Sequence, residues 1–243
     1  MAQIIVTDKD TINNNFDYVR ATLSELLIKV DAKIDIFTSG ARKTLSVMVP
    51  DEYEITARVE IADKLAEIIA VGYKYNYFKN NVHVGGLSKV QTEIFLTALI
   101  SADFDEDKAY AFSKLKNKSD FSLDGTFNFQ MQPLKKKWSE IVSYMPGCFV
   151  QKQLNEFIGF LLENRIKKVY VDAGKVYDSH YRRLYRTMLL GDCSDASILR
   201  EVMIAGGGEV EIIGNIEREE ESFLKEFYLP RITFQKDFIA FNH

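Results

Sequence analysis

The first fifty residues alternate between apolar and polar positions in ways that predict both strands and a helix. An apolar run at residues 4–6 predicts a short strand, and apolar residues at steps of three and four over residues 12–30 predict a helix. Alternation over residues 33–37 and 44–49, on either side of a Ser-Gly turn, predicts a hairpin. Residues 1–50 therefore predict a small N-terminal β-α-β-β unit.

Residues 51–165 have the three- and four-residue spacing of helices almost throughout, so we expect a helical middle. Within it, a turn of the chain is expected at Asp124-Gly125. The spacing then returns towards two, which predicts a C-terminal α/β unit over residues 166–243. The pattern predicts an α+β fold. Because no Pro- or Ser-rich linker separates the three parts, we expect them to form one continuous body.

The C-terminal part has one ambiguous segment. Residues 167–178 predict two strands joined by an Ala-Gly turn. Residues 180–190 combine helical spacing with an apolar end that equally suits a buried strand, so both interpretations stay open. A helix capped by Ser194 or Asp195 then precedes a strand at residues 209–214.

Composition and charge narrow the class of protein. Of the 243 residues, 47% are apolar and 27% are charged, which is typical of a globular chain. The net charge is −4, so a nucleic-acid site would have to be a local patch. The two cysteines, Cys148 and Cys193, form no CxxC pair, and no apolar run reaches the roughly 18 residues of a membrane span. Without signal-peptide features in the first ten residues, we expect a cytoplasmic protein with no membrane segment.

The three consecutive glycines at residues 206–208 have the wrong context for a phosphate-binding loop. Such a loop needs a strand before the glycines and a helix after them, so that the helix N-terminus faces the anion. Here a predicted helix precedes them and a predicted strand follows. Gly206 is better interpreted as the left-handed residue that ends the helix.

Patterns for metal binding are incomplete. Asp103, Asp105 and Asp107 begin like a calcium loop, but Lys108 and Lys114 stand where that loop needs Gly and Glu. These aspartates are better interpreted as acidic residues at a helix N-terminus, where the helix dipole favours them. The three histidines do not have the spacing of a zinc ligand pair. The sequence therefore predicts neither a metal nor a cofactor.

Catalytic patterns are likewise absent, apart from one weak alternative. Cys148 follows Pro146-Gly147 at a predicted helix start, a position that can lower a thiol pKa. A cysteine nucleophile also needs a base, and the candidates His83 and His180 are distant in sequence. We expect a protein that is not an enzyme.

An arginine–tyrosine patch at residues 177–186 is a candidate interaction surface. Guanidinium groups and aromatic rings together are a signature of nucleic-acid binding. The alternative is that the tyrosines belong to the core and the arginines form a solvated rim, which the negative net charge favours. The patch consists of Arg182, Arg183 and Arg186 among Tyr177, Tyr181 and Tyr185.

The segment FNFQMQPLKKKW at residues 127–138 raises the same question. Its rings and lysines could hold nucleic acid, but Lys135, Lys136 and Lys137 are consecutive and spread over about 200° of a helix, so they cannot form one phosphate-facing stripe. Pro133 suits the first turn of a helix. We expect the aromatic residues before it to be an approach segment.

The same segment resembles a known family. The segment and the helix after it contain a glycine after an acidic residue, an Asn-Phe pair, a helix with Glu-Ile-Val and a second helix with Asn-Glu-Phe-Ile. These features are similar to those of the YtxC-like family of sporulation proteins. The resemblance is strongest over residues 121–162 and departs from the family where Gln130 replaces an arginine and Gln153 a glutamate. The matching residues are Asp124, Gly125, Asn128, Phe129, Glu140, Ile141, Val142, Asn155, Glu156, Phe157 and Ile158.

The resemblance implies a cytoplasmic role in a spore-forming bacterium but no reaction. We therefore expect a non-enzymatic protein associated with sporulation that binds an unknown protein partner. The alternative is nucleic-acid binding through the patch at residues 177–186. We also expect Gln130 and Gln153 to lie close together as a neutral replacement of the family's charged pair, because two amides can exchange hydrogen bonds.

Overall fold

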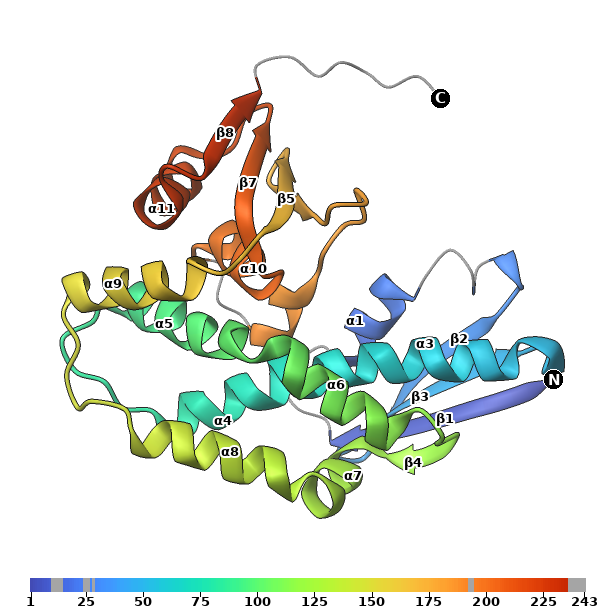
Figure 1. Ribbon diagram of the computed structural model, residues 1–243. Coiled ribbons are helices and arrows are strands. Elements are labelled where there is room, and N and C mark those ends of the chain that lie inside the picture. The colour runs from blue at the N-terminus through green and yellow to red at the C-terminus, as the bar shows by residue number, and fades with distance from the viewer. Residues whose placement is uncertain (10–14, 24–26, 28, 192–194, 236–243) are drawn as a thin grey trace. The chain divides into compact units, whose positions relative to one another are not determined.

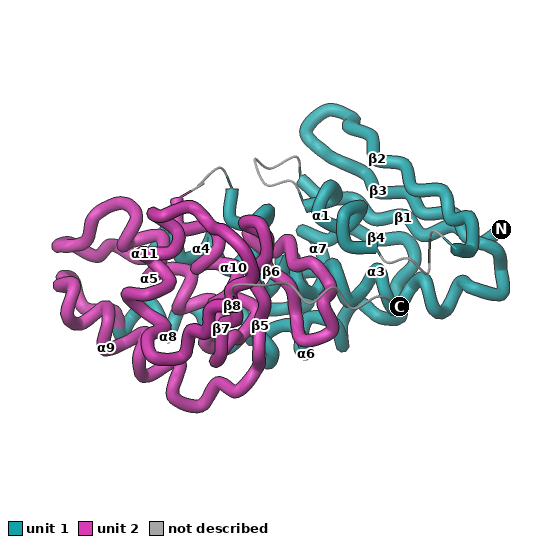
Figure 2. Tube along the Cα trace, turned by 90° about the horizontal axis from the view of Figure 1, so that it is seen from above, with its two compact units in different colours: residues 1–81, 103–144, 188–191 teal, residues 82–102, 145–187, 192–243 magenta. Residues whose placement is uncertain are grey.

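A computed structural model describes residues 1–9, 15–23, 27, 29–191 and 195–235, and it has the predicted α+β fold (Figure 1). The chain forms two compact units (Figure 2). Unit 1 comprises residues 1–81, 103–144 and 188–191, and unit 2 comprises residues 82–102, 145–187 and 192–243. The helices within residues 51–165 are divided between the two units. The continuity of the whole chain as one body stays a prediction.

Unit 1 contains a four-stranded sheet in the order β2-β3-β1-β4. Its strands are β1 (Ala2–Lys9), β2 (Lys33–Ser39), β3 (Arg42–Val49) and β4 (Asp120–Ser122). β1 is antiparallel to β3 and parallel to β4, and β2 and β3 form the predicted hairpin. The parallel strand β4 was not predicted, because three residues are too few to give an alternating pattern.

One face of this sheet is apolar and buried, and the other mixes polar and apolar side chains. Ile4, Val6, Leu45 and Val47 are buried on the face that faces the core, and α1 (Asn15–Thr22) contacts β3. On the opposite face the Gln3 amide donates to the Ser46 hydroxyl over 3.0 Å. The alternation that predicts the strands is therefore the alternation of these two faces.

The remaining helices of unit 1 pack beside the sheet, and one of them changes type within its length. Residues 54–81 run from an α-helix into a π-helical segment and back into an α-helix. These helices are η1 (Asp51–Tyr53), α3 (Glu54–Glu67), η2 (Ile68–Tyr73), α4 (Lys74–Asn81), α6 (Phe104–Leu115), α7 (Leu123–Gln130) and α8 (Gln132–Ser143).

The predicted turn at Asp124-Gly125 is wrong, and so is the approach segment after it. Both residues lie in the first turn of α7, which also contains the Phe127–Phe129 stretch. Ser122 begins this helix because its hydroxyl accepts a hydrogen bond from the Gly125 backbone N–H over 2.9 Å. A serine cap three residues before a glycine outweighed the turn preference of the Asp-Gly pair.

Unit 2 contains a second four-stranded sheet, in the order β6-β5-β7-β8. β5 and β6 form an antiparallel hairpin, whereas β7 is parallel to both β5 and β8. Helix α10 contacts α5, α11 and β7, and α9 contacts α5. The elements are α5 (Lys89–Ala102), α9 (Gln151–Leu162), β5 (Lys167–Asp172), β6 (Lys175–Tyr177), α10 (Ser197–Ile204), β7 (Gly207–Ile213), α11 (Arg218–Tyr228) and β8 (Ile232–Gln235).

The ambiguous segment at residues 180–190 is neither the predicted helix nor the predicted strand. An isolated antiparallel bridge joins Tyr177 to Arg183, and a 3₁₀-helix, η3, covers Arg186–Leu190. Gly206 confirms its predicted role, since it ends α10 with a φ of 73°. Of the two predicted caps of α10, Ser194 lies outside the described residues, and the N-cap is Ala196.

A carboxylate from another helix takes over the capping of α10. Glu220 in α11 accepts hydrogen bonds from the backbone N–H groups of Ser197, at 2.8 Å, and Ile198, at 3.2 Å. The Ser197 hydroxyl donates to the same carboxylate. Because the first backbone N–H groups of a helix have no partner within it, this contact supplies acceptors that Ala196 lacks.

Candidate functional site

The predicted arginine–tyrosine patch is organised by the β5–β6 hairpin of unit 2. Ala173 and Gly174 both have positive φ values, 46° and 75°, which is the requirement of a tight two-residue hairpin turn. The turn places Tyr170 directly opposite Tyr177. Tyr177 is the last residue of β6, which is an edge strand of its sheet. The two rings therefore lie where the chain leaves the sheet.

Tyr181 joins these two rings to form an aromatic cluster. Its ring is stacked on Tyr177, with centroids 4.8 Å apart and planes at 18°, and lies 5.4 Å from Tyr170. Its backbone is left-handed, with φ 59°, a conformation that costs a non-glycine residue on the order of 1 kcal/mol. Even so, the side chain is 41% exposed. Burial and the Asp172 carboxylate both raise the pKa of this phenol.

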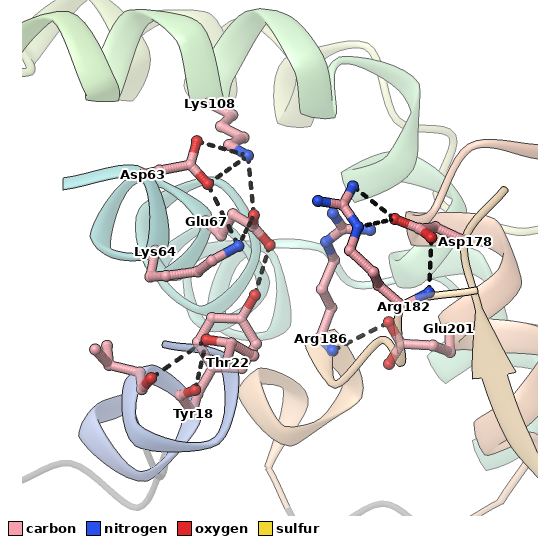
Figure 3. Close-up of polar contacts among 11 residues, drawn as sticks. Tyr18, Thr22, Asp63, Lys64, Glu67, Lys108, Asp178, Arg182, Arg186 and Glu201 are labelled. Carbon is pink, nitrogen blue, oxygen red and sulfur yellow. Dashed lines mark hydrogen bonds and ion pairs between the residues drawn. The ribbon is translucent and has the colours of Figure 1, made fainter. Parts of the chain in front are cut away.

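Asp178 holds the segment that carries Tyr181. Its carboxylate accepts hydrogen bonds from the backbone N–H groups of His180 and Arg182, each at 2.9 Å. It also pairs with the Arg182 guanidinium, at 2.9 Å from Nε and 2.8 Å from Nη2 (Figure 3). Although partial burial raises the pKa of Asp178, these hydrogen bonds outweigh it and the pKa is lowered. The arginine is thereby fixed beside the tyrosines.

The three arginines do not act together. Arg183 lies over the Tyr185 ring at 4.5 Å from its centroid. Arg186 belongs to a different contact, in which its backbone N–H donates to the buried Glu201 of α10 over 3.0 Å (Figure 3). We define the tyrosine–arginine surface accordingly, without Arg186. It consists of Tyr170, Tyr177, Tyr181, Arg182, Arg183 and Tyr185.

The tyrosine–arginine surface is neither core nor strongly basic. Tyr177 and Tyr185 are half-buried and Tyr181 is exposed, so the expectation that these tyrosines belong to the core is wrong. Of its two arginines, Arg182 pairs with Asp178, whereas Arg183 lies over the Tyr185 ring. Beside the surface, the Lys168 ammonium lies 5.2 Å from the Tyr170 ring and pairs with Glu211. The surface combines aromatic area with a partly neutralised positive charge.

The first part of the segment that resembles the YtxC-like family lies on α7 in unit 1. The Asp124 carboxylate is 2.6 Å from the Arg42 guanidinium, and the Asn128 side chain accepts from Lys135 over 2.7 Å. Phe129 is 84% exposed and Gln130 is exposed, so neither contributes to the core. These residues start and surround a helix.

The second part of that segment lies on α9 in unit 2. Gln153 accepts a hydrogen bond from the Val150 backbone N–H over 3.0 Å, which makes it a cap of its own helix. Glu156 is exposed and pairs with Lys152 at 3.6 Å, and the Phe157 ring lies 5.6 Å from that of Phe95.

The predicted contact between Gln130 and Gln153 joins residues of different units and stays a prediction. Both residues are exposed.

Unit 1 also holds buried polar contacts on either side of the π-helix η2 that the sequence analysis missed. At the end of η2, Tyr73 donates to Asp8 over 2.6 Å, and the Asn15 amide donates to the other oxygen over 2.9 Å. Burial raises the pKa of Asp8 and, together with the Asp8 charge, that of Tyr73. The Asn15 side-chain oxygen is buried and has no hydrogen-bond partner. π-Helical segments are frequent at functional sites, which is the one general signal that marks this region.

Just before η2, Glu67 collects three donors (Figure 3). Tyr18 donates over 2.5 Å to one carboxylate oxygen, while Lys108 and Lys64 approach the other at 2.9 and 3.1 Å. Burial lowers the pKa of Lys108, but Glu67 and Asp63 outweigh it and the pKa is raised. Each charge has an opposite charge beside it, so the arrangement stabilises the packing and leaves no group poised to react.

Chemically reactive groups are sparse in the described residues. No group of three or more His, Cys, Asp or Glu side chains among them could hold a metal ion. Cys148 is a free cysteine and is exposed. None of the helices in the described ranges has the length and apolar character needed to cross a membrane.

Comparisons with family models, curated proteins and solved structures find no match to this chain.

Proposed function

We propose that this protein acts by binding another protein through the tyrosine–arginine surface of unit 2. The observation that carries the proposal is Tyr181, an exposed ring held in a left-handed backbone conformation and stacked on Tyr177. A non-glycine residue keeps such a conformation only where its surroundings impose it, and these positions concentrate at binding sites. Folding here preorganises an aromatic surface for a partner.

The composition of this surface suits a protein partner. Tyr and Arg are the residues most enriched where protein interfaces have their largest binding energies. Since Arg182 is already held by Asp178, a partner does not need to immobilise its side chain.

The cellular setting of the proposal rests on the resemblance of residues 121–162 to the YtxC-like family. On that resemblance we propose a non-enzymatic role associated with sporulation, in the cytoplasm of a spore-forming bacterium. The motif residues themselves form helix starts and helix contacts, so we assign the binding to the tyrosine–arginine surface.

A photocrosslinking experiment tests the proposal. A photoreactive amino acid replaces the exposed His180 in one variant and the exposed Phe129, in unit 1, in a matched control. We expect discrete crosslinked proteins from position 180 during spore formation, and their loss when Tyr181→Ala is added. Identical products from both positions, or products unaffected by Tyr181→Ala, would contradict the proposal.

Nucleic-acid binding through the same surface is the second candidate, and Arg183 stacked on Tyr185 is the observation that favours it. It predicts that a single-stranded oligonucleotide binds with an affinity that falls steeply as salt increases, because phosphate contacts release counterions. Arg183→Gln should make that dependence shallower. Affinity that does not change with salt excludes this candidate.

A further inference from the structure

Strand β2 forms an open edge of the unit 1 sheet. It is the terminal strand in the order β2-β3-β1-β4, and among the described strands it pairs only with β3. Figure 2 shows β2 as the outermost strand of the unit 1 sheet, with β3 beside it. The outer edge of such a strand has backbone N–H and C=O groups free to pair with another strand.

The two faces of β2 differ in character. Ile34 and Ile36 are half-buried and stand opposite the core residues Val47 and Leu45 of β3. On the other face Lys33, Asp35 and Phe37 are all exposed, and Phe37 is 52% exposed.

Neither the Lys33 nor the Asp35 side chain has an ion pair or hydrogen bond within the described part of the chain. The exposed face therefore carries two unpaired opposite charges and a large ring.

We propose that β2 pairs antiparallel with β2 of a second copy of this chain, about a two-fold axis at Ile34. In this register Lys33 of each copy stands opposite Asp35 of the other, so the symmetry creates two ion pairs from one pair of residues. Directly opposite unlike charges stabilise antiparallel strands.

The same register also matches the apolar side chains. Ile34 meets Ile34 of the second copy, Ile36 meets the half-buried Ala32, and Phe37 lies diagonal to Lys33, whose aliphatic stem can cover the ring. The result is one continuous eight-stranded sheet whose apolar face extends across the two-fold axis.

The charge order disfavours two other pairings of the same strands. A two-fold axis at Asp35 places two carboxylates opposite each other. Parallel in-register pairing places each charged residue beside the same residue of the second copy. Directly opposite like charges destabilise strand pairs. Charged residues on an edge usually prevent association, but only where the approaching strand has no complementary charge. The Lys-x-Asp order is complementary to itself when reversed, so a second copy is the strand that it fits.

The test is the dissociation constant of the dimer, measured by sedimentation of the full chain over a range of concentrations. We expect a concentration-dependent dimer for the natural sequence. Lys33→Asp or Asp35→Lys alone should weaken it roughly tenfold or more, because each creates two like-charge pairs. The double exchange Lys33→Asp/Asp35→Lys restores both pairs and should recover the dimer.

A matched control and a folding check keep the outcome decisive. Lys136→Asp changes the same charge on the exposed surface of α8, where the lysine is 81% exposed, and should leave the dissociation constant unchanged. Urea unfolding of each variant shows whether unit 1 still folds. A monomer at every concentration, or a double exchange as weak as the single variants, would overturn the proposal. Tyr181→Ala should leave dimerisation intact, which separates this proposal from the binding function of unit 2.

Discussion

The Lys74 ammonium lies 2.7 Å from the Asp107 carboxylate, and both side chains are fully buried in unit 1. Trp138 donates to the same carboxylate oxygen over 3.0 Å, and Lys137 reaches the other oxygen over 3.0 Å. The pair therefore connects α4, α6 and α8. Replacing Lys74 removes the fully buried cation of the pair and leaves Asp107 with the partly exposed Lys137 ammonium, which compensates the interior charge less well.

Lys74→Met should lower the free energy of unfolding by about 3 kcal/mol, because Asp107 keeps its other donors but loses its buried cation. Urea unfolding measures the loss. Lys136→Met is the matched control: Lys136 is 81% exposed, so its replacement should change stability by less than about 0.5 kcal/mol. Equal stability of the two variants would show that the buried pair contributes nothing.

Asp8→Asn should change how stability depends on pH. Burial raises the pKa of Asp8 above its unfolded value of about 3.9. The folded state then holds the proton more tightly, so the stabilising contribution of Asp8 is complete below pH about 3.9 and is lost as pH rises through the folded pKa. The difference in unfolding free energy between the natural protein and Asp8→Asn should therefore fall as pH is raised. A difference that grows with pH would show that folding lowers the pKa of Asp8 and does not raise it.

Asp124→Asn should show the opposite dependence. Burial raises the pKa of Asp124, but hydrogen bonds from Ser122 and the Arg42 charge outweigh burial, and the pKa is lowered. Its contribution is present above the unfolded pKa of about 3.9 and is lost as pH falls through the folded pKa. Natural protein and variant should therefore become more similar in stability at low pH. Parallel pH curves for the two proteins would contradict this.

Glu220→Ala should destabilise unit 2 by about 1–2 kcal/mol, because the N-terminus of α10 loses its only described carboxylate cap. Glu219→Ala is the matched control, since Glu219 precedes it in the same first helical turn and is exposed. Hydrogen exchange at Ser197 and Ile198 should accelerate in Glu220→Ala alone. Unchanged exchange at both amides would show that the cap does not act in solution.

Replacing either of two glycines in unit 2 by alanine should change stability in opposite directions. At Gly208 a Cβ atom would lie 1.9 Å from the Arg165 carbonyl oxygen, so Gly208→Ala must displace backbone and should cost several kcal/mol, as overpacking does. At Gly159, within α9, nothing lies within 4 Å, and Gly159→Ala should stabilise by about 0.5–1 kcal/mol. Thermal unfolding of both variants checks this. Similar shifts for both would show that the two environments do not differ.

Local features of the fold were predictable because their causes are local. The β2–β3 hairpin follows from alternation on either side of a tight turn, and Gly206 follows from the left-handed conformation that ends a helix. The turn that carries Tyr181 and Arg182 is also local, since the backbone N–H groups of both residues donate to Asp178. Such features depend on neighbours only a few residues away.

Some local signals compete with one another, and the sequence alone does not show which prevails. Asp124-Gly125 has the composition of a turn, yet the Ser122 cap makes it the start of a helix. Between residues 180 and 190 helical spacing and strand composition coexist, and the bridge of Arg183 to Tyr177 replaces both with an irregular segment.

What the sequence by itself determined is the α+β class, the hairpins and the end of α10 at Gly206, because hydrophobic period and glycine conformation act over short distances. Only the tertiary structure decided the division of the helices between two units, the pairing of Lys74 with Asp107 and the capping of Ser197 by Glu220. These residue pairs are separated by 33 and 23 positions. A charged residue in a helical pattern has the same appearance whether it faces water or a buried partner, and only packing brings the partner to it.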